Sequence, residues 1–131
     1  MPEIPLTCTN ATLEVDEVGM FHLRLLPGAK VSSADVDALV SAVRSVSGSA
    51  LHPLLVEVAD AGISPSARET LLGVRIASAV ALVGVTVVDR VIAAAFMRGK
   101  GCPHEYFTSV EDAKQWLSLH PGSHALAEPA L

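Results

Sequence analysis

The sequence is poor in aromatic residues and in cysteine. It has one Trp, one Tyr and three Phe among 131 residues, so we do not expect the rows of aromatic side chains on which single-stranded nucleic acids stack. Its two cysteines, Cys8 and Cys102, are too few for the disulfide framework of a small secreted domain. We therefore expect a cytoplasmic protein with reduced thiols and an aliphatic core.

Basic charge and long apolar runs are also scarce. Nine Lys and Arg against 14 Asp and Glu give a net charge of −5 at pH 7, which excludes the basic stripe typical of duplex-binding proteins. No uncharged run is longer than that of residues 76–88, which is shorter than the roughly 20 residues that cross a bilayer. Residues 1–5 lack the basic and apolar regions of a signal peptide. We expect neither nucleic-acid binding nor a membrane span.

Aliphatic residues, in contrast, are abundant. Apolar residues make up 50% of the chain and charged residues 18%, a composition that predicts a folded domain with a substantial core. The length suits one domain, and we find neither an internal repeat nor a linker. We expect a single domain over residues 1–120 and a flexible C-terminal tail over residues 121–131, which has little to bury.

The hydrophobic pattern predicts five strands. Strict alternation over residues 11–16 and 20–25 indicates two half-buried strands, and Gly19 lies in the turn of a β-hairpin between them. The nearly continuous apolar runs at 54–58 and 78–84 are typical of buried strands in a parallel sheet. Residues 102–108 predict a short last strand.

Four helices are expected between and after these strands. Three begin with a capping box, in which a hydroxyl caps free N–H groups and an acidic residue follows three positions on. These pairs are Ser32–Asp35, Thr86–Asp89 and Thr108–Glu111. Two signals compete at the remaining helix: Ser64 before Pro65, or Ser66 with Glu69. The order predicts an α/β domain with a mixed, mostly parallel sheet of about five strands, an N-terminal β-hairpin and four helices.

Glu57 interrupts the apolar run at 54–58. A buried carboxylate is unfavourable unless it has a partner. We expect Glu57 to lie at an edge or to pair with an arginine such as Arg24. The alternative is a carboxyl group of raised pKa that marks a functional site.

Several short stretches, in this order and spacing, carry a resemblance to a known family. They are residues 54–60, 63–64, 80–84, 90–92, 106–108 and 113–117. Over residues 10–118 the chain resembles the STAS fold of SpoIIAA-type anti-sigma-factor antagonists, and is more similar to small bacterial STAS-like proteins without assigned function. The resemblance implies a non-enzymatic protein-interaction or regulatory module that binds a protein partner and forms a homodimer.

The resemblance also implies candidates for a phosphorylation switch. In those antagonists an Asp-Ser-Ser-Gly stretch opens the helix after a central strand, and a partner kinase phosphorylates a serine there. The matching region here contains Ser64, Ser66 and Arg68, but lacks that stretch, with Arg68 in place of the glycine. A phosphate on Ser66 would gain from free helix N–H groups and from Arg68. The alternative is that both serines only cap the helix.

The helix predicted after Thr86 is apolar over a wide arc. Val91, Ala95, Phe96 and Met97 are therefore candidates for an interface, with burial in the core as the alternative. Lipid-binding members of the wider fold imply a further alternative, a small apolar ligand.

Cys102 and His104 are two residues apart, so on a strand they would share a face as nucleophile and base, or as metal ligands. No third group is placed to orient the base, and the five histidines do not have the spacing of a zinc site. A hydrolase-like enzyme is thus the third hypothesis. We expect no catalytic residue, metal or cofactor.

Overall fold

The computed structural model describes residues 3–4, 11–16, 19–48, 50–60, 62–73, 77–87, 89–91, 103–119 and 123–124. The main sheet contains, in spatial order, β1 (Glu3–Ile4), β2 (Ala11–Val15), β3 (Phe21–Leu25), β5 (Ala50–Glu57), β7 (Ala77–Val83) and β8 (His104–Phe107), and β9 (Ser123–His124) pairs with β5. A second small sheet pairs β4 (Lys30–Val31) with β6 (Gly62–Ile63). The helices are α1 (Ser33–Ser47), α2 (Pro65–Gly73) and α4 (Val110–Leu117), and residues 89–91 are also helical.

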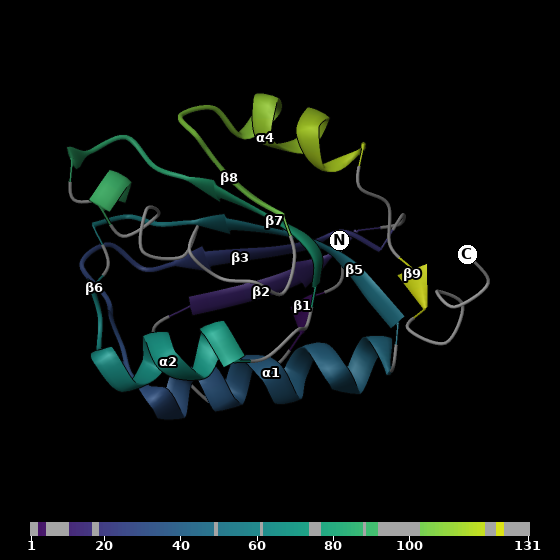
Figure 1. Ribbon diagram of the computed structural model, residues 1–131, viewed down its shortest axis with the longest axis horizontal. Coiled ribbons are helices and arrows are strands. Elements are labelled where there is room, and N and C mark those ends of the chain that lie inside the picture. The colour runs from purple at the N-terminus through teal and green to yellow at the C-terminus, as the bar shows by residue number, and fades with distance from the viewer. Residues whose placement is uncertain are drawn as a thin grey trace.

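Strand pairing confirms the predicted α/β class and the mixed sheet. β2 and β3 form the antiparallel hairpin, whereas β3, β5, β7 and β8 lie side by side and parallel. α1 and α2 lie against one face of the sheet and α4 covers the other (Figure 1). The carboxyl ends of the parallel strands therefore share one edge, from which the connections to the helices leave.

Alternate strand residues divide between two cores, as the period of two requires. On the α1 side, Phe21, Leu54 and Val56 pack with residues of α1. On the α4 side, Leu55 packs in one cluster with Leu117 and with small residues of β7. Because α4 packs over β5, β7 and β8, the same face of β2 and β3 can carry polar side chains.

The first helix begins and ends as predicted. The Ser32 hydroxyl accepts a hydrogen bond from the Asp35 N–H at 3.3 Å, and the Asp35 carboxylate accepts one from the Ser32 N–H at 2.9 Å. This is the expected capping box. Gly48 ends the helix with φ of +59°, a conformation that favours glycine.

The structure decides between the two start signals of α2. The Ser64 hydroxyl accepts a hydrogen bond from the Ala67 N–H at 3.1 Å, and the helix begins at Pro65. Proline suits this position because its missing N–H would have no partner inside the helix. Ser66 consequently lies within the first turn and not at the cap. Residues 74–76, to which the sequence extends this helix, lie outside the described residues.

Two predicted boundaries were wrong. The capping box Thr108–Glu111 is shifted by one residue, because the Ser109 hydroxyl accepts the hydrogen bond, from the Asp112 N–H at 3.3 Å. Two adjacent hydroxyl residues, each three positions before an acidic residue, make this choice ambiguous from sequence alone. β5 begins at Ala50 and runs through Pro53, with a register shift against β7 at that point, since proline cannot donate to the ladder.

Candidate functional site

The edge where β5 and β7 end brings several loops together. The Gly28 N–H donates to the Ala59 carbonyl at 2.8 Å, and the Gly62 N–H donates to the Ala29 carbonyl at 2.7 Å. Pairing of Val31 with β6 then places the starts of α1 and α2 next to each other. In open α/β sheets this edge is where ligands bind, so we treat these loops as the candidate site.

Asp89 holds the loops after β5 and β7 together. Its side chain accepts hydrogen bonds from the backbone N–H groups of Asp60 at 2.8 Å, Val85 at 3.0 Å and Thr86 at 3.3 Å. Its own N–H donates to the Thr86 hydroxyl at 3.0 Å, which confirms the predicted Thr86–Asp89 capping box. Asp89 is 1% exposed. Burial raises the pKa of Asp89, but the hydrogen bonds from these N–H groups lower it more, so its pKa lies below the ordinary value.

Two backbone features complete this arrangement. Asp60 has φ of +56°, an uncommon conformation for a residue other than glycine, and its carboxylate accepts a hydrogen bond from the Thr86 hydroxyl at 2.8 Å. A Cβ atom on Gly84 would lie 2.8 Å from Cγ of Asp89, so only glycine lets the chain pass this carboxylate. Strained residues of this kind are found preferentially at functional sites.

The structure brings the phosphorylation candidates together at the first turn of α2. The Ser64 hydroxyl is occupied as the helix cap, whereas the Ser66 hydroxyl lies 3.3 Å from it and Ser66 is exposed. Arg68, also exposed, lies further along the same turn, and its N–H donates to the Ser64 carbonyl at 3.0 Å. The capping role that sequence assigned to either serine therefore belongs to Ser64, and the Ser66 hydroxyl has no capping role.

Of the interface candidates, the structure describes only Val91. It is 63% exposed; Ala95, Phe96 and Met97 lie outside the described residues. Two further valines that the sequence analysis missed, Val85 and Val87, are 80% and 79% exposed. The available signal was the valine-rich stretch directly after Gly84, at the point where a buried strand ends.

The catalytic alternative cannot be assembled from the described residues, because Cys102 lies outside them; His104 is half-buried on β8. Among the residues that the structure describes, no group of three or more His, Cys, Asp or Glu could hold a metal ion. Within the same part of the chain, every helix is too short or too polar to cross a bilayer.

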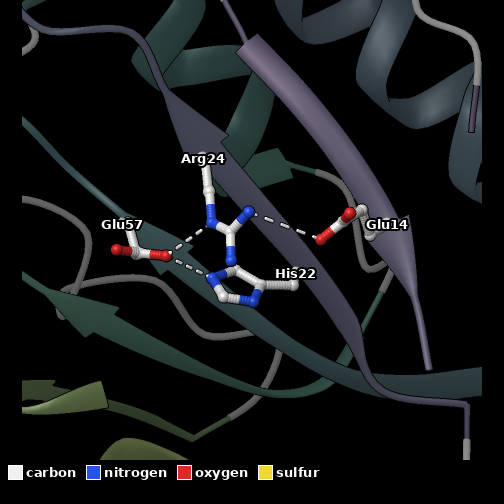
Figure 2. A network of polar contacts seen from close by, with 4 residues as sticks. All are labelled: Glu14, His22, Arg24 and Glu57. Atoms are coloured by element: carbon white, nitrogen blue, oxygen red, sulfur yellow. Dashed lines mark hydrogen bonds and ion pairs between the residues drawn. The ribbon is translucent and has the colours of Figure 1, made fainter. Parts of the chain in front are cut away.

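A second polar network lies on the sheet face beside the area that α4 covers. Figure 2 shows its four members, Glu14, His22, Arg24 and Glu57, from β2, β3 and β5. One oxygen of Glu57 accepts hydrogen bonds from Arg24 Nε at 3.0 Å and from His22 Nε2 at 2.5 Å. Arg24 Nη1 also lies 3.6 Å from a Glu14 oxygen. We refer to these four residues as the sheet-face network.

The network confirms the predicted pairing of Glu57 with Arg24 and adds His22, which the sequence analysis did not place. The signal was present, because residues two apart on a strand share a face and Glu57 is aligned with Arg24 across β3 and β5. Burial raises the pKa of Glu57, but hydrogen bonds and charge from Arg24 and His22 lower it more. Its pKa therefore lies below the usual range, in contrast to the raised pKa that was the alternative.

Comparison with known proteins identifies the fold. No protein-family model matches the chain, and no curated protein matches it. A solved structure does: the crystal structure of an uncharacterized protein of the DUF3478 family from Shewanella loihica PV-4, described as having a SpoIIAA-like fold. The two chains are 15% identical and superpose with a TM-score of 0.59 over 82% of this chain and 91% of that chain. The fold is SpoIIAA-like.

The SpoIIAA-like fold confirms the family resemblance as far as architecture is concerned. The sheet-face network and the region around Asp89 differ in which side chains near them are available for contact with another molecule. In the sheet-face network each charge has an opposite charge beside it. At the edge where β5 and β7 end, the polar groups of Asp60, Thr86 and Asp89 bond to one another and to the backbone. The exposed serine, arginine and valine side chains around them remain available for contact with another molecule.

Proposed function

We propose that this SpoIIAA-like chain is a non-enzymatic interaction module of the cytoplasm that binds a partner protein through the edge where β5 and β7 end. We call this surface the loop edge, and define it by Ser64, Ser66, Arg68, Val85, Val87 and Val91. The observation that carries the proposal is the exposure of the three valines, between 63% and 80%, next to a backbone that hydrogen bonds hold in place.

Exposed apolar groups with a polar rim favour protein binding over catalysis. Neighbouring exposed aliphatic side chains on a small domain are typical of interaction surfaces. Ser66 and Arg68, which are both exposed, would supply polar contacts at the start of α2. Thr86 joins the two halves of the loop edge through its hydrogen bond to Asp60, so a partner would meet an ordered surface that requires little ordering on binding.

Phosphorylation of Ser66 is the regulation that this geometry favours. Ser64 already supplies the cap of α2, so modification of Ser66 would leave the cap intact. The added charge would lie in the first turn, where the helix dipole stabilises negative charge. It would also face the partner at the rim of the loop edge and so change which protein is bound.

Site-specific photo-cross-linking in the natural host tests the proposal. A photoreactive amino acid at position 87 should give one discrete cross-linked protein, whereas the same residue at position 46, an exposed valine on α1, should not. A product of twice the chain mass from position 87 would identify a second copy as the partner. Equal adduct patterns from both positions would contradict the proposal.

Two serine variants test the switch with the same reporter. Ser66→Asp should change the yield of the position-87 cross-link at least severalfold, and Ser66→Ala should leave it near the unmodified level.

Native mass spectrometry of the purified protein addresses the alternative function, which is binding of a small apolar ligand. A retained small apolar molecule, with no cross-linked protein, would favour a ligand-binding role over partner binding.

A further inference from the structure

Asp89 makes one more connection than a helix cap requires. A capping carboxylate serves the N–H groups at the start of its own helix, and here one oxygen accepts from Val85 and Thr86 in this way. The other oxygen accepts from the N–H of Asp60, 29 residues earlier in the chain. A single buried carboxylate thus spans the loop after β5 and the loop after β7.

A second connection runs in parallel with the first. The Thr86 hydroxyl donates to the carboxylate of Asp60 and accepts from the N–H of Asp89. Both connections meet at Asp60, whose positive φ turns the chain toward β6. β6 leads directly to Ser64, the cap of α2, so only a few residues separate Asp60 from the phosphorylation candidate.

We infer that Asp89 couples the two halves of the loop edge, so that a protein seated on Val85 and Val87 also orders the start of α2. The inference rests on the proposed partner-binding role of the loop edge. Coupling of this kind is reciprocal. A phosphate on Ser66 would therefore alter the loop that carries the two valines, even without touching a partner bound there.

The chemistry of Asp89 suits such a coupling. Burial leaves its carboxylate no water to replace a lost N–H donor, so movement of either loop leaves a buried acceptor unsatisfied. The backbone at Gly84 runs so close to the same side chain that a Cβ atom would not fit between them. Movement of one loop without the other therefore breaks a hydrogen bond of a buried carboxylate.

Hydrogen–deuterium exchange of the full-length chain tests the coupling directly. In Asp89→Asn, an amide group of similar size replaces one acceptor oxygen, and we expect the amides of residues 59–67 to exchange about tenfold faster or more. Asp35→Asn is the matched control, because it alters the equivalent capping carboxylate of α1. It should speed exchange at the start of α1 and leave residues 59–67 unchanged.

Thr86→Val keeps the test decisive if Asp89→Asn does not fold. It removes only the hydroxyl, and should speed exchange over residues 59–67 by a smaller factor in the same direction. Unchanged exchange there in the folded variants would overturn the coupling. Because this measurement needs no partner, it remains valid even if wild-type protein gives no cross-link at position 87, an outcome that would count against the proposed function alone.

The yield of the position-87 cross-link then tests whether the coupling affects partner binding. If the wild-type protein is cross-linked at position 87, Asp89→Asn should give a lower yield, although the buried Asp89 side chain is not in contact with the partner. An undiminished yield would show that the two halves of the loop edge bind independently, and would overturn the inference while leaving partner binding in place.

Discussion

The loop edge and the sheet-face network each hold a carboxylate of lowered pKa, but by different means. Glu57 has a side chain that is 33% exposed and is held by two other side chains. Asp89 is buried and is held by backbone N–H groups of neighbouring loops. The exposed Arg24 side chain can rearrange, and its charge is screened by salt. The backbone N–H groups around Asp89 are fixed by their loops and cannot turn to a new acceptor when that carboxylate is removed. The loop edge should therefore respond to mutation far more strongly.

The largest effect is expected at Asp89. Asp89→Ala leaves three N–H groups without their acceptor and should lower the free energy of unfolding by about 3 kcal/mol or more. Glu57→Ala removes the partner of Arg24, which is largely solvated, and of buried His22, and should lower it by about 1–2 kcal/mol. Urea denaturation of both variants measures the difference. Equal losses would remove the distinction between the two regions.

Gly84→Ala should come next, because its new Cβ would overlap the Asp89 side chain. We expect a loss of about 2–3 kcal/mol in the free energy of unfolding. Gly62→Ala is the control, since no atom lies within 4 Å of a Cβ built there. It should lower the free energy of unfolding by less than about 1 kcal/mol, as substitutions on a protein surface usually do. The double variant Gly84→Ala/Asp89→Ala should lose less free energy of unfolding than the sum of the two single variants. Additive losses would show that the overlap of the new Cβ with the Asp89 side chain is unimportant.

Acid should sharpen the same comparison. Both pKa values are lowered by folding, so each carboxylate contributes stability that is fully present above its unfolded pKa and is lost as the pH falls through its folded pKa. Wild-type stability should therefore decline below about pH 4, the ordinary range for carboxyl groups. Asp89→Asn and Glu57→Gln should each flatten this decline. Thermal unfolding across that pH range measures the decline, and an unchanged slope in either variant would contradict the lowered pKa of that carboxylate.

The smallest effect is expected at the exposed end of the sheet-face network. Arg24→Gln removes the ion pairs with Glu14 and Glu57, in which the guanidinium is exposed, and should lower the free energy of unfolding by less than about 1 kcal/mol. Raising the salt concentration should reduce the difference in the free energy of unfolding between Arg24→Gln and the wild type. A large, salt-independent loss would mean that Arg24 has a structural role that its exposure does not suggest.

Much of the fold could be predicted because its signals are local. The alternation of β2 and β3, the apolar runs of β5 and β7, and the capping pairs of Ser32 and Thr86 all lie within a few residues. Prediction failed where two local signals were equivalent. Thr108 and Ser109 both precede an acidic residue at the right distance, and the packing of α4 on the sheet settles which one caps it.

The candidate site was predicted only in part. Glu57 and Arg24 could be paired because a carboxylate inside an apolar strand needs a partner, and the structure adds His22 to the same face. Ser64 and Ser66 were equivalent as caps in the sequence, and the hydrogen bond from Ala67 distinguishes them. The valine-rich stretch after Gly84 did not by itself show that Val85 and Val87 would be exposed, because an apolar residue after a strand is as compatible with burial as with a surface.

Local patterns in the sequence are sufficient to predict the order of the longer strands and of the helices, and the division of strand residues between two faces. They also predict the caps at Ser32 and Thr86. Each of these depends on contacts between near neighbours or on a period of two or 3.6 residues. The hydrogen bond between Asp60 and Asp89 depends on the folded chain, because that contact exists only after β5 and β7 lie side by side. A contact between loops far apart in sequence leaves no periodic pattern, so the coupling at the loop edge becomes visible only in the folded chain.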